Sequence, residues 1–369
     1  MKPVQERYHR RPHVVVWEIT NRCNMRCLHC EGGAGRRDPE ELTTAEALNL
    51  CDQIAALGCV RCNLSGGEPL LREDWPLLAR RLADRGVAVH VVTNGTLLDQ
   101  EAVRQAEQAG VVGVAVSLDG LQATHDRIRV WPGRKRKSSF ESALKALRVA
   151  KSSSLKVGAI THVNLWNLGE LDQVYDLLAD LYLDVWQVQL AIPEGRLRQI
   201  PEPYLIAPEQ LEQVYQSLIR AMKDDRVPVR VTDTIGYYTE MEPVIRVREK
   251  ERALPFWTGC YAGCLLMGVE SNGAVKGCPS MGPDFIAGSV RKESLAEIWG
   301  DEERFAYNTR WDESKLTGFC ASCEFRRLCR AGCTTMAYAV TGTIYENPYC
   351  IFRVRSLAAG TRCAPGRDK

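Results

Sequence analysis

The sequence predicts an α/β fold in which a partial (β/α)6 barrel, similar to a TIM barrel, is followed by a small cysteine-rich domain. Apolar runs of strand length alternate with amphipathic stretches of helix length over roughly the first two thirds of the chain. This alternation is typical of a parallel sheet with helices outside it. From about residue 236, Gly, Pro and Cys become frequent and long helical patterns stop. We therefore expect two domains, at residues 1–235 and 236–369.

The expected strands are short apolar runs, and they lie at Val14–Ile19, Val60–Leu64, Ala88–Val92, Val112–Leu118, Lys156–Thr161 and Val185–Leu190. The expected helices lie between them, at Thr44–Leu57, Trp75–Asp84, Asp99–Ala109, Phe140–Lys151 and Leu168–Leu181. Nearly continuous apolar strands are typical of a parallel sheet that is buried on both faces. Folds of this kind bind ligands at the carboxyl ends of their strands, so a motif directly after a strand is a candidate for the site.

Charge and hydropathy exclude two classes of partner. The formal net charge is only +2 for 369 residues, so no overall field favours nucleic acid or a membrane surface. The apolar run after the basic N-terminus, Val14–Ile19, is too short for a signal-peptide core or a membrane span. We expect a cytoplasmic protein that binds neither nucleic acid nor a membrane.

Cysteine is the unusual feature of the composition. The chain has 15 cysteines, and none lies between Cys62 and Cys260. A cytoplasm keeps thiols reduced, so this density favours metal binding over disulfides. A disulfide scaffold would also not leave so long a segment without a crosslink.

The first cysteine motif follows the first expected strand. Cys23, Cys27 and Cys30 have the spacing Cys-x3-Cys-x2-Cys. Three thiolates on a short loop can bind three irons of a cubane cluster and leave the fourth iron open, as a catalytic metal requires. Structural zinc is the alternative, with His29 as a fourth ligand. However, His29 is adjacent to Cys30, and this spacing strains a shared tetrahedral site.

The spacing resembles the signature of radical SAM enzymes, which use S-adenosylmethionine (SAM). Segments after the next three strands also resemble motifs of this family. The resemblance covers roughly residues 14–235. The second strand is followed by Ser65, Gly66, Gly67, Glu68 and Pro69, which resemble the family's segment for the methionine amine. Glycines let the backbone approach a ligand, and Glu68 can accept a hydrogen bond from the ammonium group. The resemblance extends to Asn94 after the third strand and to Ser117 and Asp119 after the fourth.

The resemblance implies a mechanism and further SAM contacts. SAM would chelate the open iron, and a reduced [4Fe–4S] cluster would cleave it to a 5′-deoxyadenosyl radical that takes a hydrogen atom from the substrate. An external donor of flavodoxin or ferredoxin type would supply the electron. By analogy, Asn94, Ser117 and Asp119 contact SAM, and His29 packs on or near the adenine unless it is a plain packing residue. The catalytic acid or base is not assigned.

The second half contains a denser cysteine array, which resembles the SPASM extension of radical SAM enzymes over roughly residues 255–355. The resemblance implies an iron–sulfur domain with two auxiliary clusters, so that the chain would hold three [4Fe–4S] clusters. One auxiliary set is Cys260, Cys264, Cys278 and Cys333, and the other is Cys320, Cys323, Cys329 and Cys350. A zinc ribbon at Cys320–Cys333 is the alternative. The remaining thiols have no assigned role: Cys51, Cys59 and Cys62 are expected to be packing residues, and Cys363 lies in a tail without a pattern.

Three hypotheses about the substrate follow. The favoured one is modification of a ribosomally made peptide or protein, because SPASM enzymes of this size mostly act on such substrates. Only about a dozen residues precede the first strand, so a peptide leader would be held by a separate protein or by the core itself. The second hypothesis is small-molecule chemistry on a modified haem, since Ser117–Arg129 resembles haem-modifying relatives. The third is a non-enzymatic electron carrier, which the complete set of SAM motifs argues against.

Overall fold

The computed structural model describes residues 11–35, 40–133, 137–200, 203–232, 234–247 and 257–360. Its strands are β1 Val14–Thr20, β2 Arg61–Gly66, β3 Ala88–Thr93, β4 Val111–Ser117, β5 Lys156–Val163, β6 Val185–Leu190, β7 Val229–Val231, β8 Leu266–Val269, β9 Ala274–Lys276 and β10 Gly288–Ser289. All six strands expected from the sequence are present, with ends that differ by at most two residues.

The helices in the described part are α2 Thr44–Ala56, α3 Trp75–Asp84, α4 Gln100–Gln108, α5 Gln122–Ile128, α6 Ser139–Lys151, α7 Leu171–Asp180, α8 Leu211–Asp224, α9 Glu242–Val247, α10 Leu295–Gly300, α11 Ala306–Thr309, α12 Gly318–Ser322, α13 Arg326–Cys329, α14 Thr334–Thr341 and α15 Ile351–Ala358. The five expected helices are among them. Within the described residues, no helix has the length and apolar character needed to cross a membrane.

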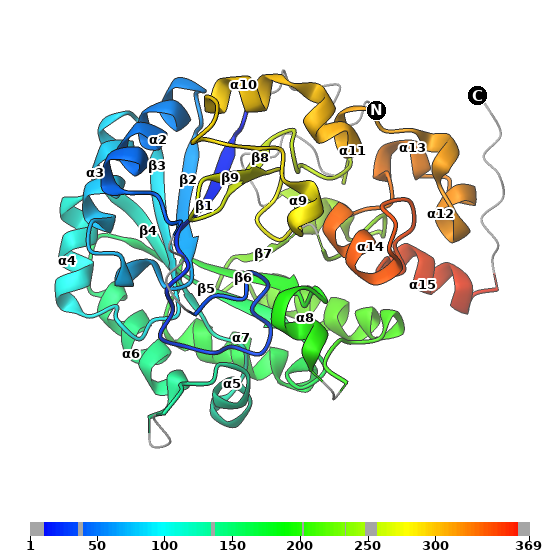
Figure 1. The fold of residues 1–369 in the computed structure, drawn as a ribbon. Helices are drawn as coiled ribbons and strands as arrows, with labels where there is room; N and C mark the ends of the chain where they lie inside the picture. The colour runs from blue at the N-terminus through cyan, green and yellow to red at the C-terminus, as the bar shows by residue number, and fades with distance from the viewer. Residues whose placement is uncertain are drawn as a thin grey trace.

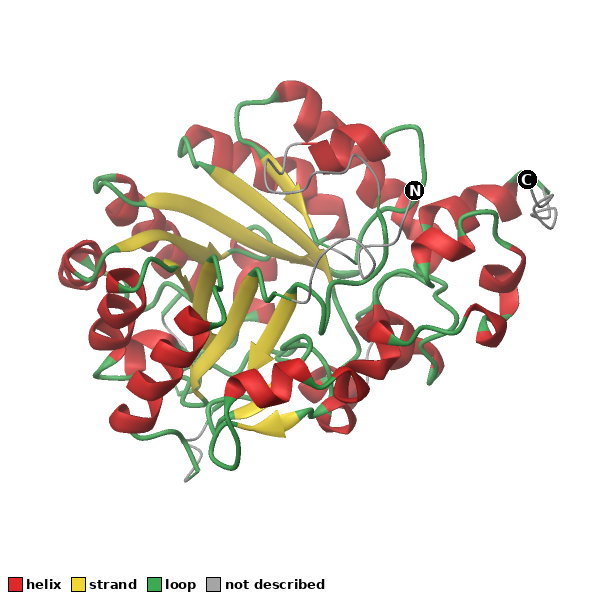
Figure 2. Ribbon diagram, turned by 90° about the horizontal axis from the view of Figure 1, so that it is seen from above, coloured by secondary structure: helices red, strands yellow, loops and turns green. Residues whose placement is uncertain are grey.

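The strands form one curved sheet with helices along its outer side (Figures 1 and 2). Their order is β10-β9-β8-β1-β2-β3-β4-β5-β6-β7. From β8 to β7 every pairing is parallel, whereas β9 runs antiparallel to both of its neighbours. The carboxyl ends of the parallel strands therefore meet at one edge, where the motifs were expected to lie.

The sheet extends further than the sequence predicted. A seventh strand, β7, follows α8, and an eighth parallel strand, β8, comes from the cysteine-rich segment and pairs with β1 from Val14↔Leu266 to Trp17↔Val269. The sheet thus continues beyond residue 235. The domain boundary at 235/236 remains a prediction, but the segment after it is not separate from the barrel sheet.

The two faces of the strands differ in burial. On β2, Cys62 and Leu64 are fully buried against the helix layer, whereas Arg61, Asn63 and Ser65 on the other face are half-buried. The same alternation occurs on β1, β3 and β6. The expectation of strands equally buried on both faces is therefore wrong for the inner face. The reason is that this face surrounds a cavity, whereas the outer face packs on the helices.

The outer layer forms because the helices present apolar stripes and begin at good caps. At the start of α2, the Thr43 side chain accepts from the Glu46 backbone N–H and the Glu46 carboxylate accepts from the Thr43 backbone N–H, which satisfies two donors that a helix start leaves unpaired. The thiols without an assigned role, Cys51, Cys59 and Cys62, are buried in this layer, as expected for packing residues. Cys363 lies outside the described residues.

Candidate functional site

The loop between β1 and α2 carries Cys23, Cys27 and Cys30, and two distant segments hold it in place. The backbone N–H of Leu28 donates to the carbonyl of Ile128 at 3.0 Å. Arg196 donates from Nε to the carbonyl of Cys27 at 3.0 Å. Next to Arg196, Gly195 has φ +56°, and a Cβ there would come within 2.1 Å of the carbonyl oxygen of Glu31. The loop is therefore packed between the end of α5 and the short 3-10 helix Gly195–Gln199 that follows β6.

The electrostatics of the three thiols fit a metal-cluster site. Burial raises the pKa of all three, that of Cys27 to about 12, and each thiol is close enough to Cys30 or Cys23 to interact electrostatically. Without a cation these thiols would stay protonated. Iron would reverse this, because metal coordination deprotonates a thiol outright. Three convergent, shielded thiols are a suitable donor set for three irons of a cubane.

A double-glycine turn brings the next motif against this loop. Gly66 has φ +129°, and a Cβ on Gly67 would come within 2.1 Å of the carbonyl oxygen of Arg22. Only glycine allows so close an approach of the two backbones. Glu68 follows and is fully buried. The segment Ser65–Pro69 thus lies directly beside the cysteine loop.

Glu68, which follows β2, forms hydrogen bonds with residues at the end of β3. Its Oε1 accepts from Thr93 Oγ1 at 2.7 Å and its Oε2 accepts from the backbone N–H of Asn94 at 2.8 Å. Burial raises the pKa of Glu68 to about 7. A carboxylate has about four acceptor positions, so one more donor, such as an ammonium group, can be accepted beside these contacts and the bond from the Leu70 N–H. Asn94 Nδ2 lies 3.9 Å from Cys23 Sγ.

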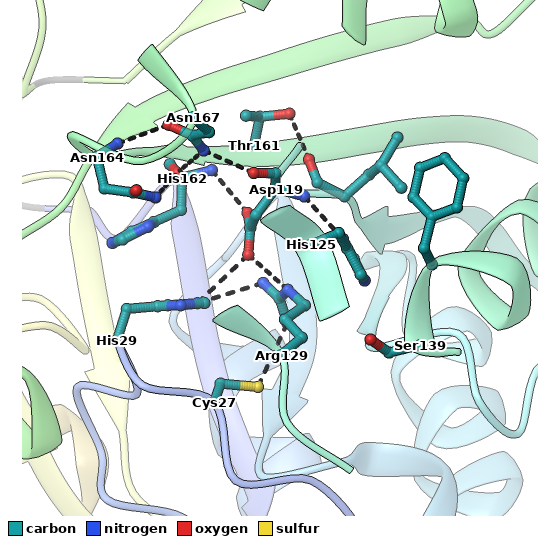
Figure 3. Close-up of polar contacts among 12 residues, drawn as sticks. Cys27, His29, Asp119, His125, Arg129, Ser139, Thr161, His162, Asn164 and Asn167 are labelled. Carbon is teal, nitrogen blue, oxygen red and sulfur yellow. Dashed lines mark hydrogen bonds and ion pairs between the residues drawn. The ribbon is translucent and has the colours of Figure 1, made fainter. Parts of the chain in front are cut away.

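Asp119 is the centre of a buried polar network (Figure 3). Its Oδ2 accepts from Arg129 Nε at 2.6 Å, and its Oδ1 accepts from the backbone N–H of His162 at 2.9 Å. Burial alone would raise the pKa of Asp119, but Arg129 and the adjacent His rings hold it well below its usual range. Arg129 in turn places Nη1 3.9 Å from Cys27 Sγ and Nη2 3.3 Å from His29 Nε2. Asp119 therefore positions the guanidinium that faces the cysteine loop.

Two aromatic residues that the sequence did not single out complete this region. His162, near the end of β5, stacks on His29 with ring centroids 4.1 Å apart, and Tyr204 lies 5.9 Å from His162. Within the described part of the chain, both ring nitrogens of His162, Nδ1 of His29 and the hydroxyl of Tyr204 are buried without a hydrogen-bond partner. Such atoms are rare in native proteins and are usually satisfied by an ordered water, an ion or a ligand. A polar residue at the end of the fifth expected strand was the signal that could have identified His162.

Ser117 lies at the end of β4 and is buried. The structure thus gathers Glu68 and Asn94 around Cys23, and Asp119 and His29 around Cys27. Their contacts with SAM remain predictions.

The cysteines of the two expected auxiliary sets lie around two cavities. A cavity of about 310 Å³ inside the barrel is lined by Cys260, Cys278 and Cys333. Cys264 belongs with them, since burial and the nearby Cys260, Cys278 and Cys264 raise the pKa of Tyr307 well above its ordinary value. A smaller cavity of about 20 Å³ is lined by Cys320, Cys323, Cys329 and Cys350. The two groups have the membership that the sequence resemblance implies.

The spacing within these groups suits clusters better than single ions. Over the described residues, no three Cys, His, Asp or Glu side chains are close enough together to hold one metal ion. A cubane needs thiols spread around a body of several atoms. His13 and Glu31 also line the larger cavity, but the four thiols of each group are a sufficient donor set for such a cluster.

A parallel barrel sheet with a three-cysteine loop at its carboxyl edge defines the class of protein. The chain belongs to the radical SAM superfamily, whose family model matches residues 17–178, and a model of the SPASM iron–sulfur cluster-binding domain matches residues 260–324. It is therefore a radical SAM enzyme that binds SAM and iron–sulfur clusters, as the sequence predicted.

Relatives that align over most of their length include haem or porphyrin synthases and a maturase. The chain is 34% identical over 351 residues to the AdoMet-dependent heme synthase of Methanosarcina barkeri, an alignment that covers 93% of this chain and 97% of the relative. It is 30% identical to the Fe-coproporphyrin III synthase of the same organism, covering 91% and 87% of the two chains. It is 28% identical to the mycofactocin maturase MftC of Mycolicibacterium smegmatis, covering 91% and 81%.

Solved structures confirm the fold alone. SuiB of Streptococcus suis bound to S-adenosylmethionine superposes with a TM-score of 0.71 at 15% identity, covering 92% of this chain and 76% of that one. The enzyme anSMEcpe with bound AdoMet has a TM-score of 0.71 at 17% identity, covering 93% and 95%.

Proposed function

We propose that this radical SAM enzyme abstracts a hydrogen atom from a modified haem or a related iron porphyrin bound in the barrel cavity. Two relatives that are at least 30% identical over most of their length are a heme synthase and an Fe-coproporphyrin III synthase. Because this chain is similar to these two enzymes, we favour the haem hypothesis over the peptide substrate that the sequence analysis favoured.

One observation carries the proposal. The 310 Å³ cavity is lined by Glu31, the residue after Cys30, and by Cys260, Cys278 and Cys333. A substrate in this cavity would lie between the SAM-cleaving site and one auxiliary site. The volume is within the range of small-molecule pockets. The cavity walls on β1, β2, β6 and β7 would also limit the access of water to a radical.

The residues of the chain have separate tasks in this proposal. Cys23, Cys27 and Cys30 would hold three irons of a cluster and leave one iron open for SAM. When bound, that cluster would supply the electron that reductive cleavage of SAM requires. Glu68 accepts from the amine, Asn94 and Ser117 line the same edge, and His29 and His162 offer a stacking surface. The two auxiliary cysteine sets hold two further clusters, which makes three in all.

A second candidate is modification of a peptide. The observation in its favour is the similarity to MftC, which is a maturase and aligns over 81% of its length. In that case the leader of the peptide would be held by a separate protein or by the core itself. In both cases an external flavodoxin or ferredoxin would supply the electron.

The triple variant Cys23→Ala, Cys27→Ala, Cys30→Ala tests the proposed radical chemistry. With dithionite and SAM, anaerobically reconstituted wild type should form 5′-deoxyadenosine, whereas the variant should form none and still retain iron on its other cysteines. Cys59→Ala, which removes a buried thiol bonded to a backbone carbonyl, is the matched control and should resemble wild type. Normal 5′-deoxyadenosine formation by the triple variant would overturn the assignment.

A second measurement tests the substrate class. Reconstituted enzyme is incubated with SAM, dithionite and either iron coproporphyrin III or candidate peptides, and the products are analysed by mass spectrometry. A mass change in the porphyrin supports the proposal. A change in a peptide and none in the porphyrin supports the second candidate instead.

A further inference from the structure

We propose that the hydroxyl of Tyr307 donates a hydrogen bond to a sulfur of the cluster on Cys260, Cys264, Cys278 and Cys333, and that this bond raises the reduction potential of the cluster. The inference rests on one part of the proposed function, the assignment of an iron–sulfur cluster to these four cysteines. It identifies a residue outside the ligand set that tunes this cluster.

The hydroxyl of Tyr307, in α11, lies where two cysteine-bearing loops cross. The backbone N–H of Gly263, the residue before Cys264, donates at 3.3 Å to the carbonyl of Gly277, the residue before Cys278. A Cβ on Gly277 would collide both with the backbone nitrogen of Gly263 and with the hydroxyl oxygen of Tyr307. The hydroxyl is therefore in contact with the backbone at the point where the two loops meet.

The neighbours of Tyr307 hold it at this crossing. Asn308, the next residue, donates from Nδ2 to the carbonyl of Ala262 at 2.7 Å. On the other side of Tyr307 in the sequence, Phe305 packs against the same loop. The ring of Phe285 meets the Tyr307 ring edge-on, with centroids 5.3 Å apart. Contacts on the ring and on both sides of the residue thus keep the hydroxyl close to the cysteine loops.

The Tyr307 hydroxyl has a proton to donate, and its oxygen is buried without a hydrogen-bond partner among the described residues. The backbone N–H of Gly277 is near this oxygen, but an N–H is itself a donor and leaves the hydroxyl proton unpaired. A buried donor without an acceptor destabilises the folded chain. We therefore expect an acceptor beside this hydroxyl in the loaded enzyme.

Two other hydroxyl groups indicate an acceptor at the same place. Of the four buried hydroxyls that lack a partner in the described part of the chain, three belong to Tyr307, Thr258 and Thr335. Thr258 lies two residues before Cys260 and Thr335 two residues after Cys333, and these four residues line the same cavity. Unpaired hydroxyls thus gather around one set of cysteines. The sulfurs of a cluster on this set would be their acceptors.

A hydrogen bond from Tyr307 would favour the reduced form of the cluster. Burial, followed by the nearby Cys260, Cys278 and Cys264, raises the pKa of Tyr307 well above its ordinary value, so the phenol remains a neutral donor. The reduced cluster carries one more negative charge than the oxidised cluster, and a more negative acceptor forms the stronger bond. Hydrogen bonds to cluster sulfurs shift reduction potentials for this reason. The bond therefore raises the potential.

Two opposite changes at this position test the inference. Tyr307→Phe keeps the ring and removes the donor, so the equilibrium constant for reduction of this cluster should fall about 10-fold, which is about 59 mV for one electron. Replacement of Tyr307 by 3-fluorotyrosine keeps the hydroxyl and makes it a stronger donor, so the potential should rise.

Tyr338→Phe is the matched control. Tyr338 also meets Phe285 edge-on, with centroids 4.9 Å apart, but its hydroxyl donates to Asp284 at 3.2 Å. This variant should leave every potential unchanged.

Redox titration of the reconstituted enzyme, followed by electron paramagnetic resonance, measures the potentials. The first cluster is identified by its response to SAM, and the shift should occur in one of the other two signals. An unchanged potential in Tyr307→Phe, or shifts of the same sign with Phe and with 3-fluorotyrosine, would overturn the inference. If Tyr307→Phe does not retain the cluster, the sign of the shift with 3-fluorotyrosine decides.

Metal analysis of the same preparations separates this inference from the rest of the proposed function. If the later cysteines hold zinc and only the signal that responds to SAM is titrated, the cluster assignment is wrong, and the inference is wrong with it. Formation of 5′-deoxyadenosine and a mass change in the porphyrin are measured independently of the titration. Their absence in wild type would refute the proposed reaction and leave the result for Tyr307 intact.

Discussion

Arg129 brings a buried positive charge to the sulfur of Cys27. Its Nε donates to Asp119, and its Nη1 lies 3.9 Å from Cys27 Sγ. Burial is the largest single influence and lowers the pKa of Arg129, but Asp119 and Cys27 together raise it above its ordinary value, so the group stays charged. Hydrogen bonds and charges near cluster sulfurs shift reduction potentials. A cation at this place stabilises the more negative, reduced form of a cluster on the loop.

We therefore predict that removing this charge makes the first cluster harder to reduce. In Arg129→Met/Asp119→Asn, which avoids leaving Asp119 unpaired, the potential should fall on the order of 50 mV, or about 1 kcal/mol for one electron. Redox titration followed by electron paramagnetic resonance measures it, with the first cluster identified by its response to SAM. Arg129→Lys keeps the charge and should shift the potential less. An unchanged potential in the double variant would contradict the prediction.

His162 gives the fold a pH dependence. Burial lowers the pKa of His162 from 6.5 to about 4. As the pH falls, His162 is protonated near pH 6.5 in the unfolded chain but only near pH 4 in the folded chain. The resulting stability is complete above pH 6.5 and is lost as the pH falls toward 4.

The substitution His162→Phe should reduce this dependence and preserve the stack on His29. Between pH 7.5 and pH 5, wild type should lose about 2 kcal/mol more stability than the variant does, a difference of a few degrees in melting temperature. Anaerobic calorimetry at the two pH values measures it. Equal losses in both proteins would show that another group determines the acid sensitivity.

Among the elements, long strands and helices could be predicted from the sequence and short ones could not. The strands from β1 to β6 are apolar runs between helical stretches, and this pattern is local. β7 and β8 have three and four residues, too few to show a period, and β8 is placed by pairing with a distant strand. The long helix α8 was not among the predicted helices, although its sequence does indicate one. Its buried apolar residues recur at helical spacing, at Leu211, Val214, Tyr215 and Leu218.

The elements of the cysteine-rich segment should differ in how strongly they depend on iron. Helices α12 and α13 have no fully buried residue, and they surround the small cavity lined by four cysteines. Strand β8 instead pairs with β1 in the main sheet. Metal binding energy should therefore be folding energy for the helices and much less so for β8.

Hydrogen exchange after anaerobic removal of iron with a chelator tests this difference. Residues 318–329 should exchange rapidly, while residues 266–269 of β8 stay nearly as protected as 111–117 of β4. Protection of residues 111–117 of β4 before and after chelation is the internal control. Rapid exchange in β8 together with the helices would mean that its pairing with β1 adds little without the clusters.

For the whole molecule, the cysteine motifs could be recognised in the sequence, whereas the cavity could not. Spacing marks each short cysteine loop as a candidate for metal binding, but the division of the later cysteines into two sets came from the family resemblance. The lining of the cavity depends on strand register and on the curvature of the complete sheet. The partners of Asp119 likewise come from α5 and β5, whose positions follow from tertiary packing rather than from any local pattern.

The pairing of β1 with β8 has a consequence for synthesis. Strand β1 leaves the ribosome before the other described strands, but its partner on one side, β8, emerges only after the rest of the parallel sheet has been made. Until then the outer edge of Val14–Thr20, which is largely apolar, is an exposed template for pairing with other chains. Nascent chains of this enzyme should therefore need a chaperone or a low rate of expression, and a fragment that ends before Leu266 should aggregate even though it contains every SAM motif.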